Sequence, residues 1–149
     1  MVKFLSSNHV WRHRDGGRYL LIGTTGAQRR DGTAVLADGV AREAACRHTQ
    51  LEWLYGQWLS SRRSPNPFGD PGLYVNDDLR IICTPICDGG TVNPAVLTAA
   101  LRAAAGVAAE RGVDLVAANA VCGCGRTRIE DVDAEDIFST VDLIVCSGH

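Results

Sequence analysis

Two glycines and two arginines stand where an apolar run gives way to an acidic stretch, within residues 116–138. Gly123 and Gly125 can adopt positive φ angles and let a ligand approach the backbone closely. Exposed N–H groups in such a loop can surround a phosphate, and a helix that follows adds its positive N-terminal end. Together with Arg126 and Arg128, this rear loop predicts a site for an anionic ligand.

A second glycine-bearing loop, the front loop, follows the apolar run that ends at Gly23. Gly32 and Gly39, with small residues beside them, leave room for a ligand against the backbone. Tight turns are the better explanation of either loop alone. Two such loops at one edge of a parallel sheet favour a binding site, because ligands of such sheets lie beyond the carboxyl ends of the strands. Asp38 is a candidate to contact a ribose or orient a water, or else a plain helix N-cap.

Neither loop carries a familiar nucleotide-binding motif. The sequence has no G-x-x-x-x-G-K-[ST] pattern, which argues against a P-loop NTPase. It also has no G-x-G-x-x-G after its first apolar strand, which argues against a dinucleotide-binding Rossmann domain.

A cysteine-dependent phosphatase is the alternative function. Cys122, Gly125 and Arg128 fit C-x-x-G-x-x-R, in which a thiolate attacks phosphorus and an arginine holds the oxygens. The fit is incomplete, because Ile129 replaces the usual Ser or Thr and Val121 replaces the frequent histidine. A buried thiol at the end of a strand is the other interpretation of Cys122.

The six cysteines raise the question of metal binding. Cys83 and Cys87 have zinc-like spacing, but the C-x-C spacing of Cys122 and Cys124 is irregular for a structural zinc site. We therefore expect no metal and no cofactor. Without a signal peptide or an apolar run of about 18 residues, the chain is expected to be cytoplasmic, with reduced thiols.

The hydrophobic periodicity predicts alternating strands and helices. Strands are expected at residues 2–5, 18–23, 73–75, 79–85, 114–121 and 142–146. Helices are expected from about residue 40, from a Thr49–Glu52 capping box, from Asn93 to Gly112, and at about residues 131–139. The segment "HRDGGR" is expected to be a turn and residues 61–72 a surface loop.

This alternation indicates an α/β protein whose sheet is covered on both faces. The length of 149 residues indicates one domain, 1–149. A net charge of −2 argues against general nucleic-acid binding, and the absence of a long apolar run argues against a membrane partner.

Three segments in this order resemble the macro domain: "YLLIGTTGAQRRDGTAVLADGVAREA", "IICTPICDGGTVNPAVLTAALRAAAGVAAERG" and "VCGCGRTRIEDV". The chain looks most similar to a small macro-like branch of bacteria and their phages. The resemblance covers about residues 18–146.

The resemblance implies a three-layer α/β/α sandwich with a mixed, mostly parallel sheet. It implies ADP-ribose, a related ADP-ribosyl or NAD-derived ligand, or an ADP-ribosylated molecule as the partner. The implied ligand-binding residues are Thr24, Thr25, Gly32, Thr33, Ala34, Val35, Gly39, Val40, Ala41, Cys122, Gly123, Cys124, Gly125 and Arg126, with Asp38 as the catalytic candidate.

The chain also departs from the family pattern. Thr24-Thr25 replaces the usual Thr-Asn, and the acidic residue that commonly holds the adenine has no clear counterpart near Ser6 to His9. The family's lysine–aspartate hydrolase branch is not matched, because Lys3 is the only lysine and Thr127 stands in place of the aspartate. The sequence leaves open whether the ligand is only bound or also slowly hydrolysed by a positioned water.

Overall fold

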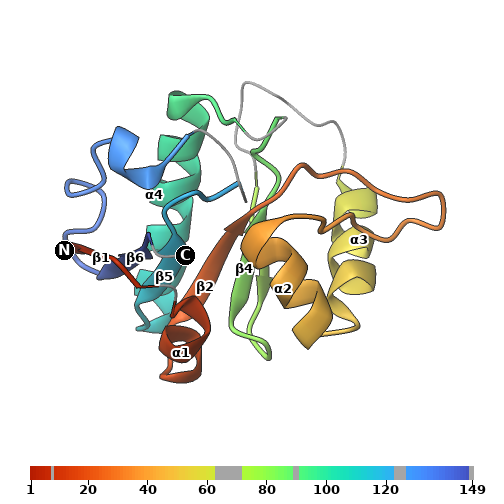
Figure 1. Cartoon of the computed structure of the whole chain (residues 1–149), viewed down its shortest axis with the longest axis horizontal. Coiled ribbons are helices and arrows are strands. Elements are labelled where there is room, and N and C mark those ends of the chain that lie inside the picture. The colour runs from red at the N-terminus through yellow and green to blue at the C-terminus, as the bar shows by residue number, and fades with distance from the viewer. Residues whose placement is uncertain (8, 63–71, 89–90, 123–126, 148–149) are drawn as a thin grey trace.

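The computed structural model describes residues 1–7, 9–62, 72–88, 91–122 and 127–147. Its centre is a six-stranded sheet in the order β1-β6-β5-β2-β4-β3 (Figure 1). The strands are β1 (Val2–Leu5), β2 (Tyr19–Gly23), β3 (Tyr74–Asn76), β4 (Ile81–Thr84), β5 (Leu115–Ala118) and β6 (Leu143–Cys146). All pairs are parallel except the β3–β4 hairpin, so the predicted mixed, mostly parallel sheet is confirmed.

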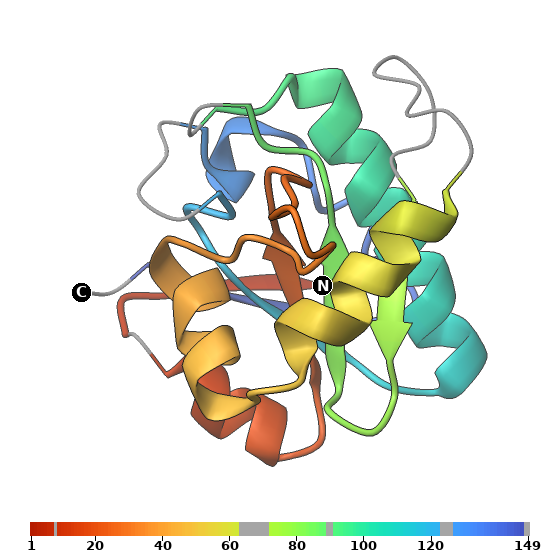
Figure 2. The same cartoon turned by 90° about the vertical axis from the view of Figure 1, so that its right-hand side faces the viewer.

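Helices cover both faces of this sheet, as predicted (Figures 1 and 2). The helices α1 (Val10–Asp15), α2 (Gly39–Arg47) and α3 (Leu51–Ser61) share one core with the side chains of Leu20 and Ile22. The long helix α4 (Pro94–Arg111) shares the other core with Tyr19 and Leu21. Because successive strand residues point to opposite faces, the continuous apolar run of β2 supplies both cores.

The sequence signals of α4 are confirmed in detail. The Asn93 side chain accepts a hydrogen bond from the Ala95 N–H at 2.8 Å, and Pro94 occupies the first turn. Gly112 ends the helix with φ at 65°, a conformation that glycine adopts without strain. Among the described residues, no helix has the length and apolarity needed to cross a membrane.

Two local predictions are wrong in part. Of the expected turn "HRDGGR", only Gly16 and Gly17 form a turn, because His13 to Asp15 are the last residues of α1, whose Val10, Trp11 and Arg14 are buried. The Thr49–Glu52 capping box does not form, because α3 begins at Leu51 without a side-chain cap. In both cases, contacts with distant parts of the chain determine where the helix forms.

The helix predicted over residues 131–139 is also absent. A 3-10 turn, η1 (Ile129–Asp131), precedes it, and the chain then makes a turn in which Phe138 N donates to Ala134 O at 3.1 Å. Ile137 and Phe138 are buried in the α4-side core. Burial of these two side chains is therefore achieved without a helix.

Candidate functional site

The three central strands end together at one edge of the sheet, which we call the carboxyl edge. Backbone hydrogen bonds continue past the strands: Thr24 N donates to Thr84 O at 2.9 Å, and Cys87 N donates to Thr24 O at 2.9 Å. On the other side of β2, Gly23 N donates to Val121 O at 3.2 Å. The segments that follow β4, β2 and β5 are therefore held side by side.

Gly23 sits at the centre of this edge and tolerates no side chain. A Cβ atom there would lie 2.9 Å from Val121 O and 3.1 Å from Cys87 Sγ. The sequence indicated Gly23 only as the end of a strand. Its close packing shows that the segments after β4 and β5 meet directly over β2.

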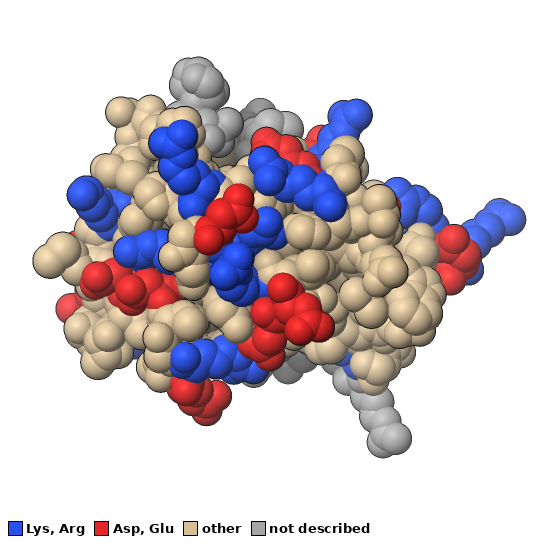
Figure 3. Space-filling view, turned by 90° about the horizontal axis from the view of Figure 1, so that it is seen from below, with Lys and Arg blue, Asp and Glu red and all other residues tan. Residues whose placement is uncertain are grey.

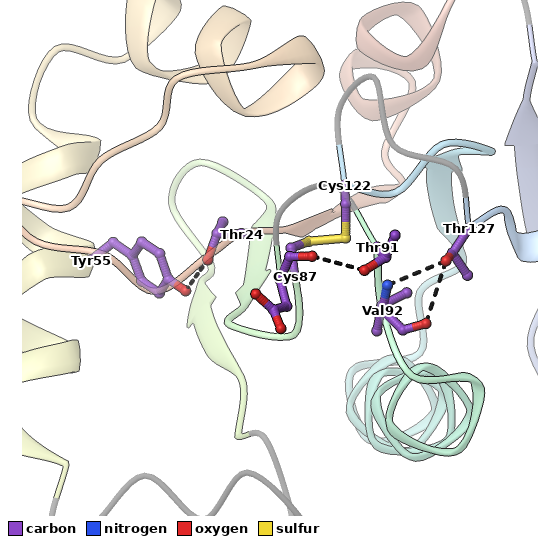
Figure 4. The surroundings of a disulfide bond; sticks show 8 residues. Thr24, Tyr55, Cys87, Thr91, Val92, Cys122 and Thr127 are labelled. Atoms are coloured by element: carbon purple, nitrogen blue, oxygen red, sulfur yellow. Dashed lines mark hydrogen bonds between the residues drawn. A yellow bond between two sulfur atoms is a disulfide. The ribbon is translucent and has the colours of Figure 1, made fainter.

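A disulfide joins these two segments. Cys87 and Cys122 are bonded with their Cα atoms 5.7 Å apart, although 35 positions separate them in sequence (Figure 4). The expectation of reduced thiols is thus wrong for this pair, because the parallel strand ends bring the two residues within bonding geometry. While the bond is intact, Cys122 offers neither the thiolate of the phosphatase alternative nor a metal ligand.

The same segments are joined a second time, beyond the rear loop. Val92 N donates to Thr127 Oγ1 at 3.2 Å, and this hydroxyl lies 3.4 Å from Val92 O (Figure 4). Between the two joints, Asp88 and Thr91 form a tight turn in which each backbone N–H donates to the other's carbonyl. The backbone of Asp88 therefore has a structural role.

The predicted rear-loop residues Gly123, Cys124, Gly125 and Arg126 lie outside the described residues. Arg128 immediately precedes η1, and its backbone N–H donates to Asp131 Oδ2 at 2.8 Å. Asn119 supports this turn, since the Oδ1 atom of its buried side chain accepts a hydrogen bond from the Glu130 N–H at 3.2 Å. The C-terminal end of the rear loop is thus supported by Asn119 and Asp131, which carry no recognisable motif in the sequence.

The front loop begins with a buried hydroxyl pair. Thr24 Oγ1 lies 2.6 Å from Tyr55 Oη on α3, and both residues are buried (Figure 4). Burial raises the pKa of Tyr55, so its hydroxyl stays neutral and can donate to Thr24. Thr24, predicted to contact ligand, therefore has its hydroxyl committed to the protein interior, whereas Thr25 is exposed.

The tip of the front loop packs against α3. Gln28 Nε2 donates to Gly32 O at 2.8 Å, Gly56 O at 3.0 Å and Ser60 Oγ at 2.8 Å. Gly56 lies so close that a Cβ atom would come within 2.9 Å of Ala34 N. Gln28 and Gly56 were missed in the sequence, because a lone glutamine and a helical glycine give no local signal.

Glu52 completes this attachment. Its carboxylate accepts from the Leu36 N–H at 3.1 Å and from Arg29 Nη1 at 3.2 Å. Arg29 also donates to Ala34 O at 3.0 Å. Arg29 thus bonds to Glu52 and to the Ala34 carbonyl, and the glutamate of the expected capping box holds the front loop.

The end of the front loop leads into α2. Asp38 is exposed and its side chain makes no capping hydrogen bond, so the N-cap interpretation of its carboxylate is not realised. Gly39 has φ at 58°, where a Cβ atom would be strained. Ala41 is buried against the sheet.

The described candidates differ in exposure. Thr24, Ala34, Ala41 and Cys122 are buried; Gly32, Thr33, Val35 and Val40 are half-buried; Thr25, Asp38 and Gly39 are exposed. The close packing of residues 32–34 against α3 explains why small residues stand there. A contact of these residues with a ligand therefore stays a prediction.

The side of the molecule on which α1 lies carries mixed charge. In Figure 3, which views the molecule from below, basic and acidic groups alternate and no extended patch of one sign forms. The ion pairs of the described residues include Arg14 with Asp15 at 2.8 Å and Arg111 with Asp77 at 2.6 Å.

Comparison with solved structures identifies the fold. Over 99% of this chain and 98% of the other, the macrodomain of Thermus aquaticus DarG superposes with a TM-score of 0.64 at 13% identity. A macrodomain protein from Streptomyces coelicolor gives 0.59 at 16% identity over 99% of both chains. A Bacteroides thetaiotaomicron protein of unknown function gives 0.67 at 12% identity, over 100% of this chain and 98% of the other.

The chain therefore has the macrodomain fold, a three-layer α/β/α sandwich, as the resemblance implied. No protein-family model matches the sequence, and no curated protein matches it significantly.

Proposed function

We propose that this chain binds ADP-ribose, or a related ADP-ribosyl or NAD-derived group, at the carboxyl edge between the front and rear loops. One observation carries the proposal: in a macrodomain fold, the two glycine-bearing loops leave adjacent parallel strands, β2 and β5, at the same edge. Ligands of open α/β sheets bind at such edges.

The proposed contacts combine backbone donors and small side chains. At the front, Thr25 and Gly39 are exposed, and Gly39 begins α2, whose N-terminal N–H groups favour a phosphate. At the rear, the proposal assigns the diphosphate to Cys122 and to residues 123–126, whose two glycines and Arg126 suit close approach of an anion.

Catalysis is proposed to be slow or absent. Asp38 is the best available helper for a water, because its carboxylate is exposed and has no capping bond. Lys3 is a poor nucleophile candidate, since it lies on β1, three strands away from β2. At strand spacings of about 4.8 Å, that places the two backbones roughly 14 Å apart.

The test of binding is calorimetry with ADP-ribose, AMP and inorganic phosphate side by side. We expect ADP-ribose to bind much more tightly than phosphate, because both loops are engaged only by the larger ligand. If phosphate binds as tightly as ADP-ribose, the proposal fails and the phosphatase alternative gains.

A matched pair of glycine variants tests the place of binding. Gly39→Ala and Gly112→Ala both force alanine into a positive φ, at 58° and 65°, but only Gly39 lies at the proposed site. Each is expected to cost about 1 kcal/mol of stability. Only Gly39→Ala should weaken ADP-ribose binding; equal affinities in the two variants would place the ligand elsewhere.

Turnover is tested by release of ADP-ribose from modified protein, modified DNA and acetylated ADP-ribose. Asp38→Ala is compared with wild type in each assay. A general base is worth about 10²–10⁴ in rate where one operates. Fast turnover that disappears in Asp38→Ala would make the chain a hydrolase, contrary to the proposed binding role.

A further inference from the structure

We propose that the Cys87–Cys122 disulfide is a reversible redox strap that holds the carboxyl edge in its ligand-binding arrangement. Reduction would then weaken binding, so the site would respond to the thiol–disulfide state of its surroundings. The regulatory part of this inference rests on the proposed function. The structural part stands on the geometry of the described residues alone.

The bond crosses the centre of the candidate site. In the strand order β5-β2-β4, Cys122 follows β5 and Cys87 follows β4, so their bond spans the end of β2. Cys87 Sγ lies 3.1 Å from where a Cβ atom of Gly23 would be. The absence of a side chain at Gly23 thus lets the strap lie directly on the strand from which the front loop leaves.

The strap also fixes one end of the rear loop. The two segments are joined at Cys87–Cys122 and again at Val92–Thr127, five positions further along each segment (87 to 92 and 122 to 127). The second joint is a part-buried hydrogen bond. Reduction would remove the stronger of these two joints, and the weaker Val92–Thr127 hydrogen bond would remain between the two segments.

Loss of that joint would raise the conformational freedom that a ligand must remove on binding. A site that is pre-organised binds more tightly because this ordering has already taken place. We therefore infer that the oxidised form has the higher affinity.

The bond is accessible to small thiols. Cys87 is half-buried, whereas Cys122 is buried, with 9% of its surface exposed. A thiolate of a small dithiol attacks one sulfur, forming a mixed disulfide and releasing the other cysteine as a thiol. The second thiol of the reagent then displaces the attached cysteine, so the protein gains two electrons and two protons and the reagent becomes a cyclic disulfide. Exchange with a small-molecule disulfide reverses these steps.

The other described cysteines provide internal controls. Cys46 is exposed on α2 and belongs to neither joined segment. Cys83 is buried within β4, and burial raises the pKa of its thiol to about 12. A native thiol assay should therefore detect Cys46 in both redox forms and Cys83 in neither.

The experiment compares the full chain after equilibration with glutathione disulfide or with dithiothreitol. Mass spectrometry of alkylated, digested protein should find a Cys87–Cys122 peptide only in the oxidised form. Hydrogen exchange in residues 84–88, 91–92, 117–122 and 127–128 should be about tenfold faster after reduction, since these amides open locally. The Kd for ADP-ribose should rise about tenfold on reduction.

Two variants sharpen the test. Cys87→Ser should show the exchange and the ADP-ribose affinity of reduced wild type, with or without reductant. Cys46→Ser removes a cysteine away from the strap and should respond to reduction like wild type. If Cys87→Ser misfolds, the comparison of oxidised with reduced wild type still tests the strap.

The outcomes separate the strap from the proposed function. A Cys87–Cys124 peptide, no disulfide, or equal exchange in both forms would overturn the strap. Equal ADP-ribose affinity in both forms would overturn its regulatory role while leaving the proposed function intact. If ADP-ribose binds neither form, the proposed function and the regulatory role fail together, and the thiol mapping and exchange still decide the strap.

Discussion

The two loops proposed to face the ligand are fixed by different chemistry. The front loop is attached to α3 through a set of neutral and charged hydrogen bonds from Gln28, Glu52 and Tyr55. The ends of the rear loop are attached to the β4–α4 segment by one covalent bond and one threonine hydroxyl. Several small contributions hold the first loop, and a single large one dominates the second.

Because their attachments differ, the two loops should respond to different conditions. Hydrogen bonds to α3 are indifferent to reductant, and loss of one leaves the others in place. The disulfide responds to reductant as a unit, and the Val92–Thr127 hydrogen bond that remains between the two segments is weaker. We expect redox conditions to alter the rear loop selectively and side-chain substitutions on α3 to alter the front loop selectively.

Loss of the disulfide should have the largest effect. The bond closes a loop of 35 positions, for which the chain-entropy account gives about 4 kcal/mol of unfolding free energy. For a chain of this length, the unfolding midpoint should fall by about 10 °C. Thermal unfolding of wild type with and without dithiothreitol measures this, and Cys87→Ser should show no such difference. An unchanged unfolding midpoint of wild type in dithiothreitol would show that the disulfide does not dominate the attachment of the rear loop.

Gly56→Ala should have the next largest effect, on the front loop. The added Cβ atom would lie 2.9 Å from Ala34 N and Thr33 Cα, and closer still to Gly32 O, so α3 and the loop must separate. We expect a loss of about 2–3 kcal/mol in urea unfolding. Gly106→Ala on α4 is the control, since a Cβ atom there meets nothing within 4 Å and should stabilise by about 0.5–1 kcal/mol. A neutral Gly56→Ala would show that the tip of the loop is not held on α3.

Tyr55→Phe should have a moderate effect. It removes the hydroxyl that pairs with Thr24 Oγ1 at 2.6 Å and leaves a buried polar atom without its partner. The expected loss is about 1–2 kcal/mol. Adding Thr24→Val should cost little more, because replacing both partners avoids the unpaired hydroxyl. Additive losses in this double-mutant cycle would show that the two hydroxyls do not interact.

Glu52→Gln should have the smallest effect. It removes the ion pair with Arg29, whose side chain is 49% exposed, and keeps an oxygen that can accept from Leu36 N–H. We expect a loss of about 0.5–1 kcal/mol that shrinks at high salt. Glu110→Gln, at an exposed position of α4, is the control and should be neutral. A loss larger than that of Tyr55→Phe would mean that charge, rather than the buried hydroxyl pair, dominates the front loop.

Where structure depends on neighbours in sequence, the sequence determined it. The spacing of Leu97, Ala100, Leu101, Ala104 and Ala108, with Asn93 before and Gly112 after, predicted α4 and its buried face. The uninterrupted apolar run of β2 predicted an interior strand, and the alternation of strands and helices predicted the class. These signals are local, because helix periodicity, caps and terminators lie within a few residues of one another.

Contacts between distant segments were decided only by the tertiary structure. α1 is a helix of six residues, too short to be stable alone. It forms because Val10 and Trp11 pack in the core shared with α2 and α3, and Arg14 is also buried. Glu52 fits a capping box by its spacing, yet its carboxylate is used by Leu36 and Arg29. The bond between Cys87 and Cys122 follows from the parallel order β5-β2-β4, which brings two strand ends together; spacing along the chain carries no information about which cysteines will meet.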